Sequence, residues 1–142
     1  MTAAADASGA VADYIPQLGR VDPDQFGVSV CTIDGQRHSI GQADTYFCVQ
    51  STCKPINYCL AMETHGAEEV HQYVGREPSG RGFNELTLNH ARRPHNPMIN
   101  AGAIMSCSLI KAEITMADRF DFVMSQWQAL CGGVKPAFSN SV

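Results

Sequence analysis

A proline at position 55 fixes where the longest helical pattern of this chain begins. Proline lacks the N–H that bonds four residues back, so a helix tolerates it only in the first turn. The surrounding segment 52–65 is helical in pattern, and its helix therefore begins no earlier than about Ser51. This places Ser51 among the free N–H groups at the positive end of the helix dipole. Lys54, three residues later, lies on the same face of the first turn.

Ser51 and Lys54 have the spacing of a serine nucleophile and a lysine base. A serine hydroxyl is a poor nucleophile until a neighbouring base takes its proton. A lysine can act as that base where burial and other cations favour its neutral form. The N–H groups at a helix start can form part of an oxyanion hole. The same spacing also fits a serine near a helix start with a solvated lysine, so this motif is a hypothesis that needs its context.

Length and composition indicate one globular domain. The chain has 142 residues, of which 44% are hydrophobic and 17% charged, as is ordinary for a folded protein rather than a disordered one. The net charge of -4 and the scattered arginines argue against a nucleic-acid partner. No apolar run approaches the roughly 20 residues that cross a bilayer, so we expect no membrane association.

The cysteines and histidines give no sign of a metal site. The six cysteines form no C-x-x-C pair and no zinc-ligand spacing. Of the five histidines, His65 and His71 are six positions apart and have no acidic partner at ligand spacing. Residues 1–12 have neither a secretory signal pattern nor an arginine-rich transit pattern, which favours a reducing compartment. Residues 1–10, rich in alanine with serine and glycine, are expected to be disordered, with the folded part over residues 11–142.

Turn and cap signals predict the order of the elements. Asp34-Gly35 joins the strand-like runs 26–33 and 36–41, which predicts a β-hairpin with a two-residue type I′ turn. Asn96-Pro97 is typical of an N-cap followed by the first residue of a helix. Helices are predicted over residues 52–65, 67–74, 97–112 and 116–131, with glycines at 66, 75 and 132 as stops.

The last predicted helix has two further features. Thr115-x-x-Asp118 resembles a capping box at its start. Its apolar residues recur at i, i+3, i+4 and i+7, which indicates a face packed in the core rather than a cofactor site. These residues are Phe120, Val123, Met124, Trp127, Leu130 and Cys131. Residues 76–97 form a long irregular segment, and loops of this length are usually functional or mobile.

Several runs of sequence resemble the serine-dependent glutaminase family, and its animal mitochondrial branch in particular. The runs are Phe47-Cys48-x-Gln50-Ser51-x-x-Lys54-Pro55, Tyr73-Val74-Gly75-x-Glu77-Pro78-Ser79-Gly80 and Pro94-His95-Asn96-Pro97-Met98-x-Asn100-Ala101-Gly102-Ala103-Ile104. Further similarity extends the resemblance from about residue 11 to residue 140. Runs this long are specific to the family, and the resemblance therefore implies that Ser51 and Lys54 are the catalytic pair.

The resemblance implies an α/β (α+β) fold similar to β-lactamases and penicillin-binding proteins. In this chain it would comprise an N-terminal β-hairpin followed by a mainly helical portion. The implied reaction is hydrolysis of L-glutamine to L-glutamate and ammonia, without a metal or organic cofactor. The family is also oligomeric, which implies a homotetramer or association with full-length glutaminase subunits. The implied location is the mitochondrion, with the cytoplasm as the alternative.

The resemblance also implies a role for each site residue. Ser51 would attack the side-chain amide and contribute its N–H to the oxyanion hole, while Lys54 would accept the serine proton and help to protonate the leaving ammonia. Tyr14 would belong to the catalytic group, and Gln50, Ser51, Asn100 and Tyr14 would line the substrate pocket. Taken alone, Asn100 fits a residue that bonds its local backbone and Tyr14 a half-buried packing residue.

The sequence departs from the family pattern in two places. First, the resemblance implies that the sequence stops at roughly the middle of the family's catalytic domain, so we expect it to lack a glutamate, a second asparagine, tyrosines and a backbone amide of the family's site. Half of an oxyanion hole cannot hold a transition state in fixed geometry, and we therefore expect at most feeble activity from this chain alone. Second, residues 80–89 correspond to the family's regulatory loop, where Glu85 replaces a basic residue.

Two alternatives follow from the same residues. A β-lactamase or peptidase would carry Ser-Asp-Asn and Lys-Thr-Gly motifs, and neither occurs in the sequence. The other alternative is a non-catalytic product that binds or regulates full-length glutaminase subunits, which nothing in the residues excludes.

Overall fold

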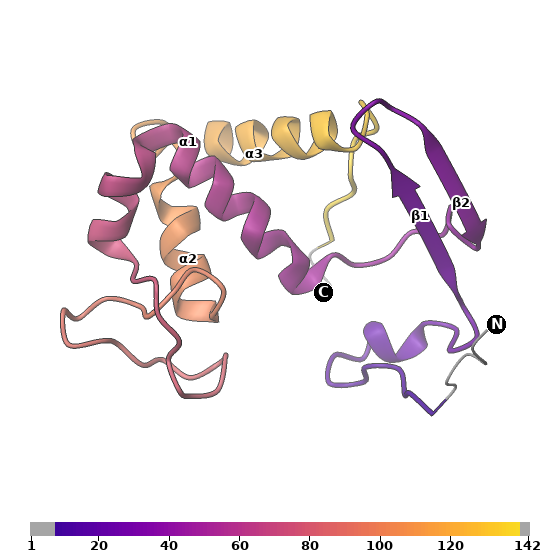
Figure 1. Ribbon diagram of the computed structural model, residues 1–142, viewed down its shortest axis with the longest axis horizontal. Coiled ribbons are helices and arrows are strands. Elements are labelled where there is room, and N and C mark those ends of the chain that lie inside the picture. Colours follow the sequence, from indigo (N-terminus) through magenta and orange to yellow (C-terminus); the bar gives the residue numbers. More distant parts are fainter. Residues whose placement is uncertain (1–7, 140–142) are drawn as a thin grey trace. The chain divides into compact units, whose positions relative to one another are not determined.

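The computed structural model describes residues 8–139, which form two compact units (Figure 1). One unit contains residues 8–48 with 138 and 139, and the other contains residues 49–137. Of the segment expected to be disordered, residues 1–7 lie outside the described part, and residues 8–10 are exposed without regular secondary structure. The elements in order are η1 (Leu18–Arg20), β1 (Gly27–Cys31), β2 (Arg37–Gly41), η2 (Gln50–Thr52), α1 (Cys53–Tyr73), α2 (Asn100–Leu109) and α3 (Met116–Leu130).

The first unit contains the predicted β-hairpin. β1 and β2 pair antiparallel, with Gly27 opposite Gly41 and Cys31 opposite Arg37. All ten strand residues are exposed. Because successive side chains of a strand point to opposite faces, Val28, Val30 and Ile40 share one face of the hairpin. This two-stranded sheet and the three helices make the protein a mixed α and β structure, as predicted.

The turn of the hairpin is longer than the predicted two-residue type I′ turn. It runs from Thr32 to Gln36. The Thr32 N–H donates to Gln36 O at 2.9 Å, and the Gly35 N–H donates to Thr32 O at 3.0 Å. Gly35 has a φ of 87°, but Asp34 does not share the positive φ that a type I′ turn requires. The Asp34 carboxylate accepts hydrogen bonds from the Thr32 hydroxyl and the Gln36 amide, which favours the longer loop.

Helix α1 starts within the limit set by Pro55 and breaks at the predicted glycine. The 3-10 turn η2 leads directly into it at Cys53. Gly66 has φ 78° and ψ 164°, so two helical halves meet at a bend there. The second half ends at Tyr73, and Val74 is extended. The expectation of two helices separated at Gly66 is therefore confirmed.

Helix α2 begins three residues later than predicted. Asn96 Oδ1 accepts hydrogen bonds from the N–H groups of Met98 (2.9 Å) and Ile99 (3.2 Å), but these close a turn rather than open the helix. Ile99 is extended, with a ψ of 158°, and the helix starts at Asn100. The Asn-Pro signature was therefore misassigned, because an asparagine caps an isolated turn with the same side-chain bonds. The helix also ends at Leu109 instead of residue 112.

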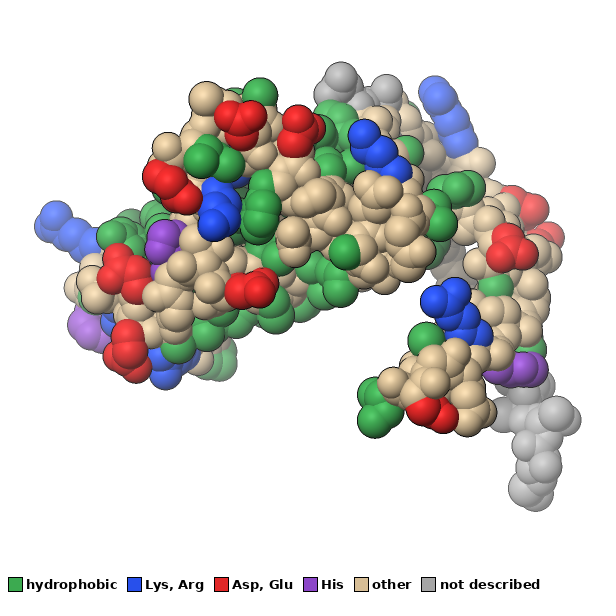
Figure 2. Space-filling model, turned by 90° about the horizontal axis from the view of Figure 1, so that it is seen from above, with side chains coloured by type: hydrophobic (Ala, Val, Ile, Leu, Met, Phe, Trp, Pro, Cys, Tyr) green, Lys and Arg blue, Asp and Glu red, His purple; other side chains and the backbone are tan. Residues whose placement is uncertain are grey.

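Helix α3 starts at the predicted cap, but its apolar face is less buried than expected. Thr115 Oγ1 accepts the N–H of Asp118 at 3.2 Å, which confirms the N-cap. Phe120 and Leu130 are 43% and 63% exposed, and Cys131 is exposed, so their assignment to the core was wrong. The helix meets the core only over its middle turns, through partly buried residues that include Val123. In the view of Figure 2, hydrophobic side chains reach the molecular surface beside charged ones.

The core of the second unit lies between α1, the end of α2 and the middle of α3. Its buried residues are Leu60, Ala61, Val70 and Ile110, and Tyr58, Met62, Leu109, Phe122 and Val123 pack against them while partly exposed. Val70 comes from the second half of α1, so the bend at Gly66 brings both halves of that helix into one core. Over residues 8–139, no helix has the length and apolar character to cross a bilayer.

Candidate active site

Ser51 lies on the short turn that opens α1. It is the middle residue of η2 and is exposed to solvent. Among residues 8–139, neither its hydroxyl nor its backbone N–H has a hydrogen-bond partner. A hydroxyl and an N–H that are both available beside a helix start are the two groups that a serine nucleophile needs.

The backbone bends sharply just before Ser51. Gln50 has a φ of 44°, in the left-handed region that side chains other than glycine rarely adopt. Such a conformation costs on the order of 1–3 kcal/mol and is retained where the surrounding structure enforces it, often at a functional site. Thr52 supports the turn from the other side, because its hydroxyl and N–H both donate to Val49 O. The exposed position of Ser51 therefore depends on a constrained turn.

Lys54 and Asn100 are brought together from residues 46 positions apart. The Lys54 amine donates to Asn100 Oδ1 at 2.7 Å, and both side chains are half-buried. Lys54 is in the first turn of α1 and Asn100 is the first residue of α2, so this bond joins the starts of the two helices. An ammonium group has three donors, and the bond to Asn100 leaves two for other acceptors.

Phe83 contacts both members of this pair, and sequence reasoning missed it. Its carbonyl accepts the N–H of Asn100 at 2.9 Å, and the Lys54 amine lies 5.8 Å from the centre of its ring. That distance is within the range of a cation–π interaction. Glu85 closes the turn around Phe83, because its carboxylate accepts the N–H of Gly82 at 3.0 Å. The segment 80–89, singled out by resemblance as regulatory, therefore reaches the candidate site directly.

No local pattern in the sequence marks Phe83. It is one aromatic residue in a polar loop, 65% exposed, and it belongs to no helical or alternating series. The only available signal was the expected regulatory role of its loop.

Tyr14 belongs to the other compact unit. Its side chain is 72% exposed in a segment that precedes η1. The remaining predicted site residues, Gln50, Ser51, Lys54 and Asn100, all belong to the second unit. The second unit therefore contains four of the five predicted residues, and within it the side chains of Lys54 and Asn100 are in contact.

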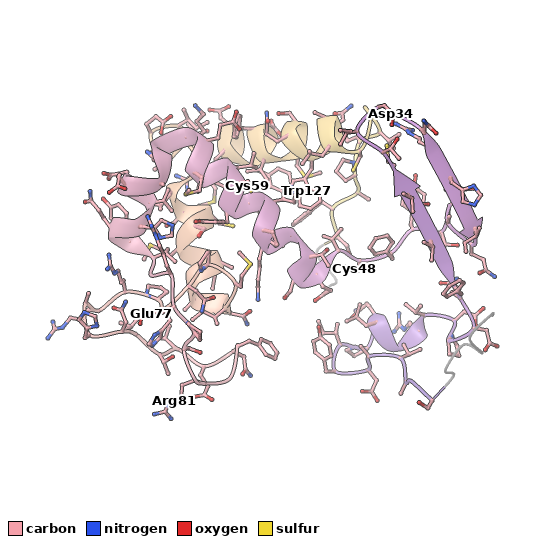
Figure 3. All side chains as sticks on the ribbon, viewed as in Figure 1. Asp34, Cys48, Cys59, Glu77, Arg81 and Trp127 are labelled. Carbon is pink, nitrogen blue, oxygen red and sulfur yellow. The ribbon has the colours of Figure 1, made fainter. Side chains whose placement is uncertain are left out.

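A layer of polar contacts behind Lys54 ties the three helices together. Asn57, one turn after Lys54, accepts the indole N–H of Trp127 at 3.1 Å and lies 3.5 Å from Cys107 Sγ. Figure 3 shows Trp127 on α3, near α1. Because an indole N–H can only donate, it fixes the orientation of the Asn57 amide, whose NH₂ group then points to Cys107. Desolvation raises the pKa of the Cys107 thiol, against the opposing effect of this hydrogen bond.

A hollow in the second unit lies away from these residues. Its volume is about 420 Å³, and its lining includes Tyr58, His71 and Arg76 but none of the predicted site residues. The candidate active site is instead the group of residues around Lys54, because an active site is defined by its reactive side chains and not by the volume of a hollow. Within residues 8–139, no three His, Cys, Asp or Glu side chains are grouped so that they could hold a metal ion.

The known proteins to which this chain is similar are glutaminases. The glutaminase family profile matches residues 9–142. The chain is 52% identical to putative glutaminase 2 of Caenorhabditis elegans and 49% identical to the mitochondrial liver isoform of glutaminase from Rattus norvegicus; each match covers 94% of this chain. A glutaminase of Corynebacterium efficiens is 46% identical over 89% of the chain.

Solved structures are similar as well. The crystal structure of Mglu in its glutamate form matches with a TM-score of 0.80 at 40% identity, over 89% of this chain and 30% of that one. The chain spans 22% of the length of the nematode and rat relatives and 30% of the bacterial one. The profile and the relatives cover nearly the whole chain, so it belongs to the glutaminase family.

Proposed function

We propose that this chain supplies the nucleophile part of a site that hydrolyses L-glutamine to L-glutamate and ammonia. The observation that carries the proposal is the bond from Lys54 to Asn100, with Ser51 exposed to solvent three residues before Lys54. This bond joins the Lys54 amine and the Asn100 amide at the starts of two helices, and an amine base that follows a serine hydroxyl by three residues is a pair of groups that amide cleavage can use.

Each residue has a defined part in the proposed reaction. The Ser51 hydroxyl attacks the side-chain carbonyl carbon of glutamine, and Lys54 in its neutral form takes the hydroxyl proton. The carbonyl oxygen becomes an oxyanion that the Ser51 N–H stabilises. The C–N bond then breaks, the proton held by Lys54 goes to the leaving ammonia, and a glutamyl ester of Ser51 remains. Water hydrolyses this ester and releases glutamate.

The remaining assignments of this proposal come from the family resemblance. Asn100 binds the amino-acid end of glutamine, Gln50 lines the pocket, and Tyr14 joins the catalytic group. The complete domain has a fold similar to β-lactamases and forms a homotetramer. A mitochondrial location is supported by the rat and mouse relatives, which are named as mitochondrial.

Covalent labelling of the Ser51 oxygen provides a test of the nucleophile that does not depend on full turnover. The chain would be incubated with a glutamine analogue that carries an electrophilic diazoketone in place of the amide, and the modified peptide located by mass spectrometry. We expect an adduct on Ser51, loss of that adduct in Ser51→Ala, and protection by added L-glutamine. Ser125→Ala is the matched control, because the Ser125 hydroxyl is used within α3 and bonds Phe122 O at 2.7 Å.

Ammonia release from L-glutamine completes the test. We expect slow release that Ser51→Ala abolishes and Ser125→Ala leaves unchanged. Absence of both adduct and ammonia would contradict the proposal and favour the non-catalytic alternative, in which the chain binds full-length subunits. Labelling of some other residue with Ser51 unmodified would contradict the assignment of the nucleophile.

A further inference from the structure

Asn57 is bonded to side chains of two other helices, one turn after Lys54. Its side-chain oxygen accepts the indole N–H of Trp127, on α3, at 3.1 Å. Its NH₂ group donates to Sγ of Cys107, on α2, with 3.5 Å between the two atoms. Both polar ends of the amide are thus used, and a side chain this short passes the restraint on to the backbone of α1.

The restraint acts on the part of α1 that carries Lys54. Residues three apart on a helix are neighbours on one face, and the side chains of Lys54 and Asn57 both reach α2. The Lys54 amine bonds Asn100 Oδ1 at 2.7 Å, at the start of α2, and Asn57 bonds Cys107 two turns further along the same helix. Successive turns of α1 are therefore fastened to α2 by separate side-chain bonds.

The position of the Lys54 amine depends on the backbone that carries it. A lysine side chain has a flexible four-carbon stem, so its amine is placed by the first turn of α1 at one end and by Asn100 at the other. A sideways shift of that turn would lengthen the bond to Asn100 beyond hydrogen-bonding distance. Asn57 opposes such a shift, because the same movement would stretch its own bonds to Cys107 and Trp127.

We propose that Asn57 is the positioning residue for the Lys54 amine, and that its bonds to Trp127 and Cys107 hold the first turn of α1 where this amine meets Asn100. The importance of Asn57 for catalysis rests on the proposed function, in which Lys54 takes the hydroxyl proton of the nucleophile. Its effect on the position of the amine does not. Asn57 acts through Lys54 and not on the substrate, so its loss should slow the reaction without weakening substrate binding.

NMR of the lysine ammonium groups tests the position of Lys54 without any reaction. A hydrogen-bonded ammonium exchanges its protons with water more slowly than a solvated one. The chain has three lysines, at positions 54, 111 and 135, so Lys54→Arg assigns the signal. We expect slow exchange in the unmodified chain and exchange at least about fivefold faster in Asn57→Ala, because the bond to Asn100 is then formed for a smaller part of the time.

Two controls separate this effect from a general loss of packing. Cys107→Ala removes the acceptor of the Asn57 amide and should speed the exchange, whereas Cys107→Ser keeps an acceptor and should not. His65→Ala removes a different bond between α1 and α2, in which the His65 ring donates to Leu109 O at 2.6 Å. This bond lies about three turns after Lys54, so His65→Ala should lower the stability of the fold but leave the exchange of the Lys54 ammonium unchanged.

Labelling of Ser51 by the diazoketone analogue measures the consequence for the reaction. The labelling rate is followed against analogue concentration, under conditions where circular dichroism shows each variant to be folded. We expect Asn57→Ala to lower the maximal rate by about tenfold, because the base is misplaced, and to leave the half-saturating concentration unchanged. His65→Ala should change neither quantity. An undiminished maximal rate in Asn57→Ala would overturn the proposal.

The exchange measurement can overturn the proposal in three ways. The first is an equal exchange rate of the Lys54 ammonium in Asn57→Ala and in the unmodified chain. The second is an equal effect of Asn57→Ala and His65→Ala, and the third is fast exchange in the unmodified chain, since its bond to Asn100 would then not persist. If exchange behaves as expected but Ser51 of the unmodified chain forms no adduct, Asn57 does position Lys54 and only the proposed hydrolysis is contradicted.

Discussion

The Lys54 amine donates a 2.7 Å hydrogen bond to the side-chain oxygen of Asn100 and thereby couples the first turn of α1 to the first residue of α2. The backbone N–H of Asn100 is held in turn by Phe83 O. The position of the Lys54 amine is thus set by its bond to the first residue of α2 and by the loop whose Phe83 carbonyl holds that residue.

Asn100→Leu should weaken both the fold and the site. It removes the oxygen that Lys54 bonds, and a hydrogen bond to a charged group is worth about 1.5–3 kcal/mol, less where it is partly exposed. We expect the free energy of unfolding in urea to fall by about 1 kcal/mol and glutamine-dependent ammonia release to drop by at least about tenfold. Asn100→Asp is the control: it keeps an oxygen for Lys54, so its stability should stay near that of the unmodified chain. Equal stability of the Leu and Asp variants would contradict this view of the bond.

Gly102→Ala should destabilise the start of α2. A Cβ at this position would lie 1.8 Å from Asn96 O, a backbone atom that cannot move independently. Overpacking of this kind costs typically about 1–3 kcal/mol, which a urea unfolding curve resolves. Gly9→Ala introduces the same methyl group where nothing lies within 4 Å, and its midpoint should not change. If Gly102→Ala unfolded at the same midpoint as Gly9→Ala, the close approach of Asn96 to α2 would be disproved.

Trp127→Phe should loosen α3 from the other helices. The substitution keeps an aromatic ring but removes the indole N–H that Asn57 Oδ1 accepts at 3.1 Å. We expect a loss of about 1 kcal/mol in unfolding free energy, because the site is half-buried and water can replace part of the bond. A double-mutant cycle with Asn57→Ala should give a coupling energy of at least about 0.5 kcal/mol. Additive effects of the two substitutions would rule the bond out as a contributor.

Asp34 should titrate below its ordinary pKa. The hydrogen bond from the Thr32 hydroxyl, followed by that from the Gln36 amide, lowers the pKa of this carboxyl. A group whose folded-state pKa is depressed contributes stability above its unfolded-state pKa and loses it as the pH falls through the folded value. The hairpin turn at Asp34 (Figure 3) should therefore loosen only in acid, below the ordinary aspartate value of 3.8.

A carboxyl-carbon NMR titration would follow Asp34 directly. Thr32→Val should raise its pKa towards the ordinary value, whereas Thr32→Ser, which keeps the hydroxyl, should leave the pKa low. An unmodified Asp34 that titrates at the ordinary value would show that the two hydrogen bonds do not persist in solution.

Local chemistry made much of the second unit predictable. Pro55 limits the start of α1, Gly66 marks its bend and Thr115 caps α3, and each signal acts within a few residues of the chain. The start of α2 was misplaced for the same reason. Asn96 forms the side-chain bonds of a cap, but whether a helix follows depends on Ile99, whose extended backbone leads into the bond between Asn100 and Phe83.

The candidate site could be predicted only in part. The spacing of Ser51 and Lys54 is visible in the sequence, whereas the partnership of Lys54 with Asn100 spans 46 positions and only the family resemblance placed both residues in one site. No sequence pattern marks Phe83, because it contributes a backbone carbonyl that bonds Asn100 and a ring that lies near the Lys54 amine, and both contacts depend on the tertiary structure. The partial exposure of α3 was not predictable either, since a periodic pattern shows which face is apolar but not how much of it is covered.

The left-handed backbone of Gln50 lowers the stability of the fold but fixes the direction in which the next residue, Ser51, points. Glycine there would relieve the torsional cost of the bend, yet it would also let the peptide that leads into Ser51 swing. A chain relaxed in this way would resist unfolding no less than the original and would present its hydroxyl in many directions instead of one. If selection acted on the stability of the fold alone, Gln50 would therefore be among the first residues expected to be replaced by glycine.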